Sequence, residues 1–278
     1  MAKLVRELMR PGVITCQPEA TLGQVAMILT EHHVHALFVS GADGSIVGII
    51  TDFDLLAGEW LSGDPQSLEV MRKLTAGDLM STPVNTIEAS APAKEAAQRM
   101  QERVVRRLLV TENNHPAGVI SISDLVASIA ERAITRRETV ADVMSDAFLA
   151  CRDQTPVVSA ARAMTSSGWR SVLVVDAYGK PLGVVSGLDL LRFCDFESAC
   201  KEITVADVMH PALTIHMTAT LQEAADKLIE NHHHRLVVVD PAMPDSVPLG
   251  IISSFDIVAE MARPESVWQQ NRTIDKPK

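Results

Sequence analysis

The sequence predicts an α+β protein built from four copies of one strand–helix–strand–strand–helix unit, which pair two by two. Each copy opens with an apolar residue followed by a methionine, namely Met9, Met80, Met144 and Met209. Each copy closes on Gly-apolar-apolar-Thr/Ser-x-x-Asp, here called the closing motif, whose glycines follow one another at intervals of 65 to 70 residues. These glycines are Gly48, Gly118, Gly183 and Gly250. A pattern that recurs in phase over nearly the whole chain indicates repeated structural units.

Local signals predict the elements of a unit in order, and unit one illustrates them. A short extended stretch at residues 13–15 follows the opening methionine, and the capping box Thr21-x-x-Gln24 then starts a helix. Apolar residues 37–39 predict a central strand, and the closing glycine begins the next strand. The closing aspartate starts a second helix, because two apolar residues follow it in every unit.

The expected division of the chain is four units of about 60 residues and a polar tail. The predicted boundaries are residues 1–66, 67–133, 134–200, 201–263 and, for the tail, 264–278. A single three-stranded sheet of this size hardly closes a core of its own, so the units are expected to pair.

Composition excludes several classes of protein. The net charge is −10, which makes nucleic acid a poor partner, and no apolar run approaches the length needed to span a membrane. The charged N-terminal residues do not resemble a signal peptide. The four cysteines, Cys16, Cys151, Cys194 and Cys200, form no Cys-x-x-Cys pair and indicate no disulfide framework. A cytoplasmic protein is expected.

The closing motif places a hydroxyl and a carboxylate three residues apart where a strand gives way to a helix. Free backbone N–H groups at a helix start suit a phosphate, and a carboxylate there can accept hydrogen bonds from the hydroxyls of a ribose. The alternative is plain helix capping, since Asp, Ser and Thr are all good caps. The two roles are compatible.

On these residues, the repeat resembles the cystathionine-β-synthase (CBS) domain, and four copies resemble two tandem pairs, often called Bateman modules. The resemblance covers roughly residues 1–262. It implies that the closing motif binds adenosine nucleotides, with aspartate on the ribose and Thr or Ser near the phosphate. The implied ribose ligands are Asp54, Asp124, Asp189 and Asp256, and the implied hydroxyl groups are Thr51, Ser121, Ser186 and Ser253.

The resemblance also implies that the first strand of each unit supplies an adenine pocket through its backbone and apolar side chains. The corresponding residues are Val13, Ile14, Thr15, Val84, Asn85, Thr86, Phe148, Leu149, Ala150, Leu213, Thr214 and Ile215. These positions are equally well explained as core strand.

Positive charge for phosphate stands just before the central strand of three units. The candidates are Arg106, Arg107, Arg170, His234 and Arg235, and the resemblance favours the same location. Unit one has only His35 there. A solvated corner between helix and strand is the alternative for each arginine.

Two histidine clusters, His32-His33-x-His35 and His232-His233-His234, fall at equivalent places in units one and four. Adjacent histidines at a helix end point to different faces, and neither Cys nor Glu accompanies them at metal-site spacing, so no metal site is expected. Cys16 and Cys151 also fall at equivalent places and are explained by strand packing. No catalytic motif is present, and an enzyme is not expected.

The expected function is therefore that of a non-catalytic sensor, with AMP, ADP or ATP as regulatory ligand, with or without magnesium. A homodimer is expected because apolar helix faces remain to be covered beyond each pair, and a downstream partner protein is left unidentified. One alternative is a scaffold with degenerate sites. Another is a sensor of a different adenosyl ligand, such as S-adenosylmethionine, NAD or a cyclic dinucleotide.

Overall fold

The computed structural model describes residues 3–57, 69–70, 72–130, 138–193, 203–243 and 247–263. It confirms four strand–helix–strand–strand–helix units. Unit one consists of β2 (Thr15–Cys16), α1 (Leu22–Glu31), β3 (Ala36–Ser40), β4 (Ile46–Thr51) and α2 (Asp52–Ala57). Unit two consists of β5 (Thr86–Glu88), α5 (Ala93–Glu102), β6 (Arg107–Glu112), β7 (His115–Ser121) and α6 (Ile122–Ala130).

The second half of the chain repeats this order. Unit three consists of β8 (Ala150–Arg152), α7 (Val157–Ser167), β9 (Ser171–Val175), β10 (Pro181–Ser186) and α8 (Gly187–Phe193). Unit four consists of β12 (Thr214–His216), α10 (Leu221–Glu230), β13 (Arg235–Val239), β14 (Gly250–Ser253) and α11 (Ser254–Ala262). The expected polar tail, Cys194 and Cys200 lie outside the described residues.

Each sheet has the same internal topology. The first strand runs parallel to the central strand, and the third strand runs antiparallel to it, as β2, β3 and β4 do in unit one. Every residue of β3 is buried, because the central strand has neighbours on both edges and on both faces.

The structure adds a short helical turn before each opening methionine, which the sequence patterns did not predict. These turns are η1 (Val5–Glu7), α4 (Ala76–Leu79), η2 (Val140–Asp142) and α9 (Val205–Val208). In three of them a threonine and an aspartate form a capping box, as Thr75 and Asp78 do.

The residue after each opening methionine is here called the entry position. It pairs with the sheet of the neighbouring unit in the same half of the chain, here called the sister unit, and not with the sheet of its own unit. Strand β1 (Arg10–Pro11) of unit one joins β7 of unit two, and β11 (His210–Pro211) of unit four joins β10 of unit three. Isolated bridges complete both exchanges, between Ser81 and Ile49 and between Ser145 and Ile251. Units one and two therefore form one pair, and units three and four the other, as predicted.

This exchange explains the glycine of the closing motif. A Cβ on Gly118 would overlap the backbone carbonyl oxygen of Arg10, and one on Gly183 would lie 2.7 Å from that of His210. At Gly118, Gly183 and Gly250 the backbone of the sister unit approaches so closely that only glycine fits, whereas at Gly48 the close neighbour is the side chain of Met80.

Substitution of this glycine is expected to destabilise the protein. Gly118→Ala should lower the free energy of unfolding by about 1–3 kcal/mol, because backbone must move to admit the methyl group. Urea unfolding measures this change. Gly41→Ala is the control, since only side-chain atoms surround its Cβ position. Equal stability of the two variants would contradict the explanation.

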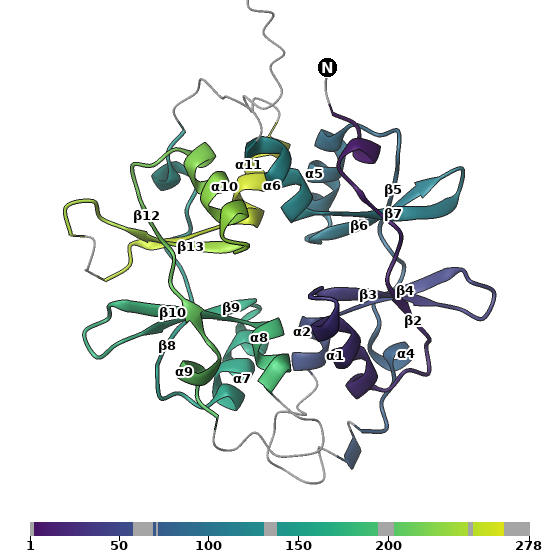
Figure 1. Ribbon diagram of the computed structural model, residues 1–278, viewed down its shortest axis with the longest axis horizontal. Helices are drawn as coiled ribbons and strands as arrows, with labels where there is room; N and C mark the ends of the chain where they lie inside the picture. The colour runs from purple at the N-terminus through teal and green to yellow at the C-terminus, as the bar shows by residue number, and fades with distance from the viewer. Residues whose placement is uncertain are drawn as a thin grey trace, which may run out of the picture.

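Helices join the two pairs into a ring of four units (Figure 1). Helices α1 and α2 contact α7 and α8, while α5 and α6 contact α10 and α11. One hydrophobic core consequently consists mainly of residues of units one and three, and a second mainly of residues of units two and four. The turns α4 and α9 add residues to the first core, and η1 and η2 add residues to the second. The helix faces on which the homodimer prediction depended are thus covered within the chain, so they no longer support a homodimer, which stays a prediction.

Candidate functional site

Each closing motif caps the helix that follows it. In unit one, Asp54 Oδ2 accepts hydrogen bonds from the backbone N–H and the hydroxyl of Thr51, at 2.8 and 2.7 Å. The three other motifs repeat this pattern with Ser121, Ser186 and Ser253 as donors. Capping is therefore a real role of all four aspartates, and it occupies one carboxylate oxygen of each.

The second carboxylate oxygen differs between units. Arg10 Nε donates to Asp124 Oδ1 at 3.1 Å, and His210 Nε2 lies 2.9 Å from Asp189 Oδ1. Within the described part of the chain, Asp54 Oδ1 and Asp256 Oδ1 have no such partner. Two motifs thus keep a free acceptor.

The four central strands, β3, β6, β9 and β13, all begin near the middle of the ring (Figure 1). We call the following residues the central cluster: His35, Asp52, Arg106, Arg107, Arg170, His234 and Arg235. The rings of His35 and His234 are 5.2 Å apart between centroids, and His35 Nδ1 lies 2.8 Å from Asp52 Oδ2. All five phosphate candidates from the sequence belong to this cluster.

Two arginines of the central cluster reach across to the other half of the chain. The guanidinium carbon of Arg106 in unit two lies 5.3 Å from the ring centroid of Phe255 in unit four. Arg170 in unit three lies 4.7 Å from the ring centroid of Phe53 in unit one. Both are cation–π contacts, so the cluster links the halves as well as concentrating charge.

The arginines of the central cluster repel one another in a partly desolvated place. Burial, followed by the charges of Arg235 and Arg170, lowers the pKa of Arg106 to about 9. Burial lowers the pKa of Arg235 to about 10, against the opposing charge of Asp256. Both groups stay charged at neutral pH, and an anion bound between them would relieve the repulsion.

His234 behaves differently from the arginines. Burial, followed by the charges of His35, Arg235, Arg106 and Arg107, lowers its pKa to about 3. Its imidazole is therefore neutral at pH 7, although the ring lies in a position where a bound anion would favour the charged form.

Asp52 is a member of the central cluster that the sequence comparison missed. Its carboxylate is buried, which raises its pKa, but the hydrogen bond and charge of His35 and the charges of Arg107 and Arg170 outweigh burial and lower it. The cluster therefore contains one buried carboxylate facing four guanidinium groups. The other three units have Ile122, Gly187 and Ser254 at this position.

The twelve residues proposed for adenine pockets lie at or just before the first strands. Of these residues only Ile215 is buried. Ile14, Phe148, Leu149 and Leu213 are partly buried and pack against the hydrophobic cores, and the other seven are partly or fully exposed. In all four units a residue of this segment accepts a backbone hydrogen bond from the central strand, as the Asn85 carbonyl does from Leu109.

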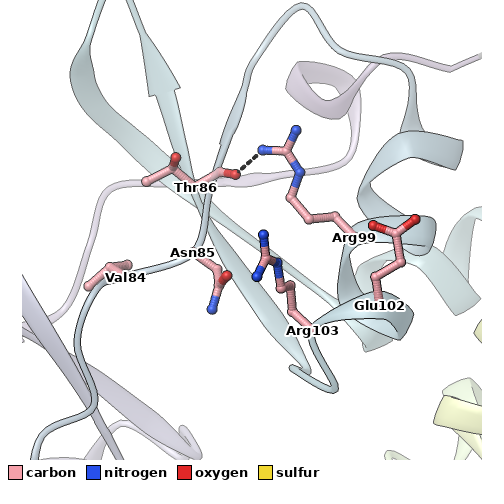
Figure 2. Close-up of a pocket in the computed structure, with 6 residues that line it drawn as sticks. All are labelled: Val84, Asn85, Thr86, Arg99, Glu102 and Arg103. Atoms are coloured by element: carbon pink, nitrogen blue, oxygen red, sulfur yellow. Dashed lines mark hydrogen bonds between the residues drawn. The ribbon is translucent and has the colours of Figure 1, made fainter.

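One of these segments lines a cavity of about 380 Å³ (Figure 2). Its walls are Val84, Asn85, Thr86, Arg99, Glu102 and Arg103. Arg99 donates to the Thr86 carbonyl and forms an ion pair with Glu95, 2.8 Å away. The volume lies in the range of small-molecule sites, and three of the twelve predicted residues line it.

The histidine clusters are divided among separate contacts. His33 Nδ1 lies 2.8 Å from an Arg192 nitrogen, His233 packs edge-on against His210, and His234 faces His35. Over the described ranges, no group of three or more His, Cys, Asp or Glu side chains comes together to hold a metal. Burial raises the thiol pKa of Cys16 and of Cys151, as expected of packed cysteines.

The chain has four tandem units, and each entry position pairs with the sheet of the sister unit. This architecture is that of a protein of tandem CBS repeats. The CBS domain model matches residues 5–59, 76–131, 140–195 and 205–263, and the chain belongs to the CBS-domain family. No helix among the described residues is long and apolar enough to cross a membrane.

The comparisons also find individual relatives. Hypoxic response protein 1 of Mycobacterium tuberculosis is 29% identical over 132 residues, which are 47% of this chain and 88% of that protein. The crystal structure of protein MJ1225 from Methanocaldococcus jannaschii is similar with a TM-score of 0.80 at 19% identity, over 92% of this chain and 99% of the other. An uncharacterized Pyrococcus horikoshii protein has a TM-score of 0.63 at 20% identity, over 93% and 100% of the two chains. The last two likenesses concern the fold alone.

Proposed function

We propose that this chain is a non-catalytic sensor that binds an adenine nucleotide. The ribose lies at a closing-motif aspartate, the adenine against a first-strand segment, and the phosphates at the central cluster. The observation that carries the proposal is the convergence of four guanidinium groups on one place, where the carboxylate of Asp52 is buried among them and those of Asp124 and Asp256 act on them from the closing motifs. Such an excess of positive charge suits a phosphate, for which arginine is the preferred partner.

A signal can follow from the same contacts. Arg106 and Arg170 stack on phenylalanines of the opposite half of the chain. A phosphate that draws these guanidinium groups toward itself would weaken or rearrange the stacking. The ligand then favours one arrangement of the two halves, and a partner protein reads that arrangement.

A thermal-shift screen tests the proposal. AMP, ADP and ATP, with and without magnesium, should raise the melting temperature, whereas GTP should not. A ligand at 100 times its dissociation constant adds about 2.7 kcal/mol to the stability of the native state. No shift with any adenine nucleotide at millimolar concentration would contradict the proposal and favour a scaffold with degenerate sites.

The contribution of the phosphates is tested separately. Arg235→Gln should weaken ATP binding by about tenfold or more, because a charge-assisted hydrogen bond is lost, and should change adenosine binding little. Calorimetric titration measures both affinities. Arg162→Gln, on the exposed surface of α7, is the control. Equal ATP affinity in both variants would favour an adenosyl ligand without terminal phosphates.

A further inference from the structure

The entry position is equivalent in all four units, because its register against the sister sheet is the same. Arg10 pairs with Val119 and His210 with Val184, while Ser81 pairs with Ile49 and Ser145 with Ile251. In each case the partner is the residue directly after the glycine of the closing motif. Each entry residue therefore stands beside the closing-motif aspartate of its sister unit.

The side chain at the entry position decides the state of that aspartate. Arg10 and His210 reach the second oxygen of Asp124 and Asp189. Serine is too short and carries no charge, and the second oxygens of Asp54 and Asp256 remain without a partner in the described ranges. Since capping holds the first oxygen in every unit, an aspartate paired at the entry position has its second oxygen engaged as well, and a ribose diol must displace Arg10 or His210 to bind there as it would at an unpaired aspartate.

A second, independent difference follows the same division. The residue before the aspartate is Phe53 in unit one and Phe255 in unit four, and each carries an arginine of the other half on its ring. The corresponding residues are Ser123 in unit two and Leu188 in unit three. The units with a free aspartate are thus also the units to which the opposite half delivers a guanidinium group.

We infer that the chain has two open and two locked nucleotide sites, with one of each in either half. The open sites are at Asp54 and Asp256. The phosphate-binding arginine that comes from the opposite half of the chain is Arg170 for the site at Asp54 and Arg106 for the site at Asp256. The locked sites are at Asp124 and Asp189, which Arg10 and His210 occupy in place of a ligand. This inference rests on the proposed function and specifies which sites it uses.

Exchanging entry residues tests the inference. Calorimetric titration of the full chain with AMP is expected to give two ligands per chain. Ser81→Arg places beside Asp54 the same residue type that engages Asp124 in unit two, and it should remove one site. Ser145→Arg should remove the site at Asp256 in the same way. The double variant should bind no AMP. Ser81 is exposed, and thermal melting without ligand checks that each variant folds.

Arg10→Ser is the matched control, because it removes a lock without touching an open site. Its guanidinium group is largely exposed, with 76% of the side-chain surface accessible, so folding should not depend on it. The two original sites should keep their affinity. Full stoichiometry in the Ser81→Arg, Ser145→Arg double variant, or loss of a site in Arg10→Ser, would overturn the inference. A native chain that binds no adenine nucleotide would instead refute the proposed function itself.

Discussion

The first half of the chain, residues 1–130, is expected to form a dimer when it is produced without the second half. Helices α1, α2, α5 and α6 lose the helices that cover them, and both hydrophobic cores lose about half of their residues. Each buried Leu or Ile contributes about 1.5–3 kcal/mol, against a total stability of about 5–15 kcal/mol. A second copy presents the same kind of helix face and can restore the cover.

Sedimentation equilibrium of the half chain measures this association. Leu56→Lys should weaken it, because Leu56 is buried where Gly187 of the second half approaches it, and the buried lysine would lack a partner. A half chain that stays monomeric and melts at the temperature of the full chain would show that the shared cores matter little for stability.

Nucleotide binding at neutral pH is expected to take up a proton at His234. The pKa of this histidine is about 3 without ligand, because burial and the charges of His35, Arg235, Arg106 and Arg107 disfavour the imidazolium, while Asp52 is the one carboxylate within the central cluster. A phosphate reverses the sign of the local field and raises the pKa. Affinity should therefore rise as the pH falls from 8 toward 6.

Calorimetric titration in two buffers of different ionisation enthalpy counts the protons. His234→Asn should abolish the uptake, and His216→Asn, on an exposed strand position, should leave it unchanged. The same depressed pKa affects the unliganded protein. Below pH 6.5 His234 is protonated in the unfolded chain but stays neutral in the native chain. The free energy of unfolding therefore falls by up to about 1.4 kcal/mol for each pH unit between 6.5 and about 3. If the calorimetric titration finds no proton uptake when the wild-type protein binds nucleotide, this account of His234 is contradicted.

The repeat could be predicted from the sequence because its signals are local. Capping boxes, apolar periodicity and the closing motif each lie within one unit, and the structure confirms four units and their pairing. The packing of unit one on unit three and of unit two on unit four could not be predicted. All four units have similar apolar helix faces, and nothing local in the sequence says which face covers which.

The candidate site likewise contains residues that could be predicted from the sequence and residues that could not. The arginines before the central strands were found because they recur at one position, and the structure brings all of them together. Asp52, Arg10 and His210 were missed because they stand where the units differ, and a search for shared residues passes over such positions. The residue after each opening methionine carried the signal, since it is charged or titratable in units one and four and a serine in units two and three.

The two shared cores also set the order in which the chain can fold during synthesis. The core of units one and three is complete only when residue 208 has been made, and that of units two and four only at residue 258. The ribosome therefore releases a whole first half whose apolar helices have no cover until much of the second half follows. Contacts between such distant segments form slowly and leave aggregation-prone surface exposed meanwhile. For this protein the vulnerable period lies in translation, before any ligand can bind between its halves.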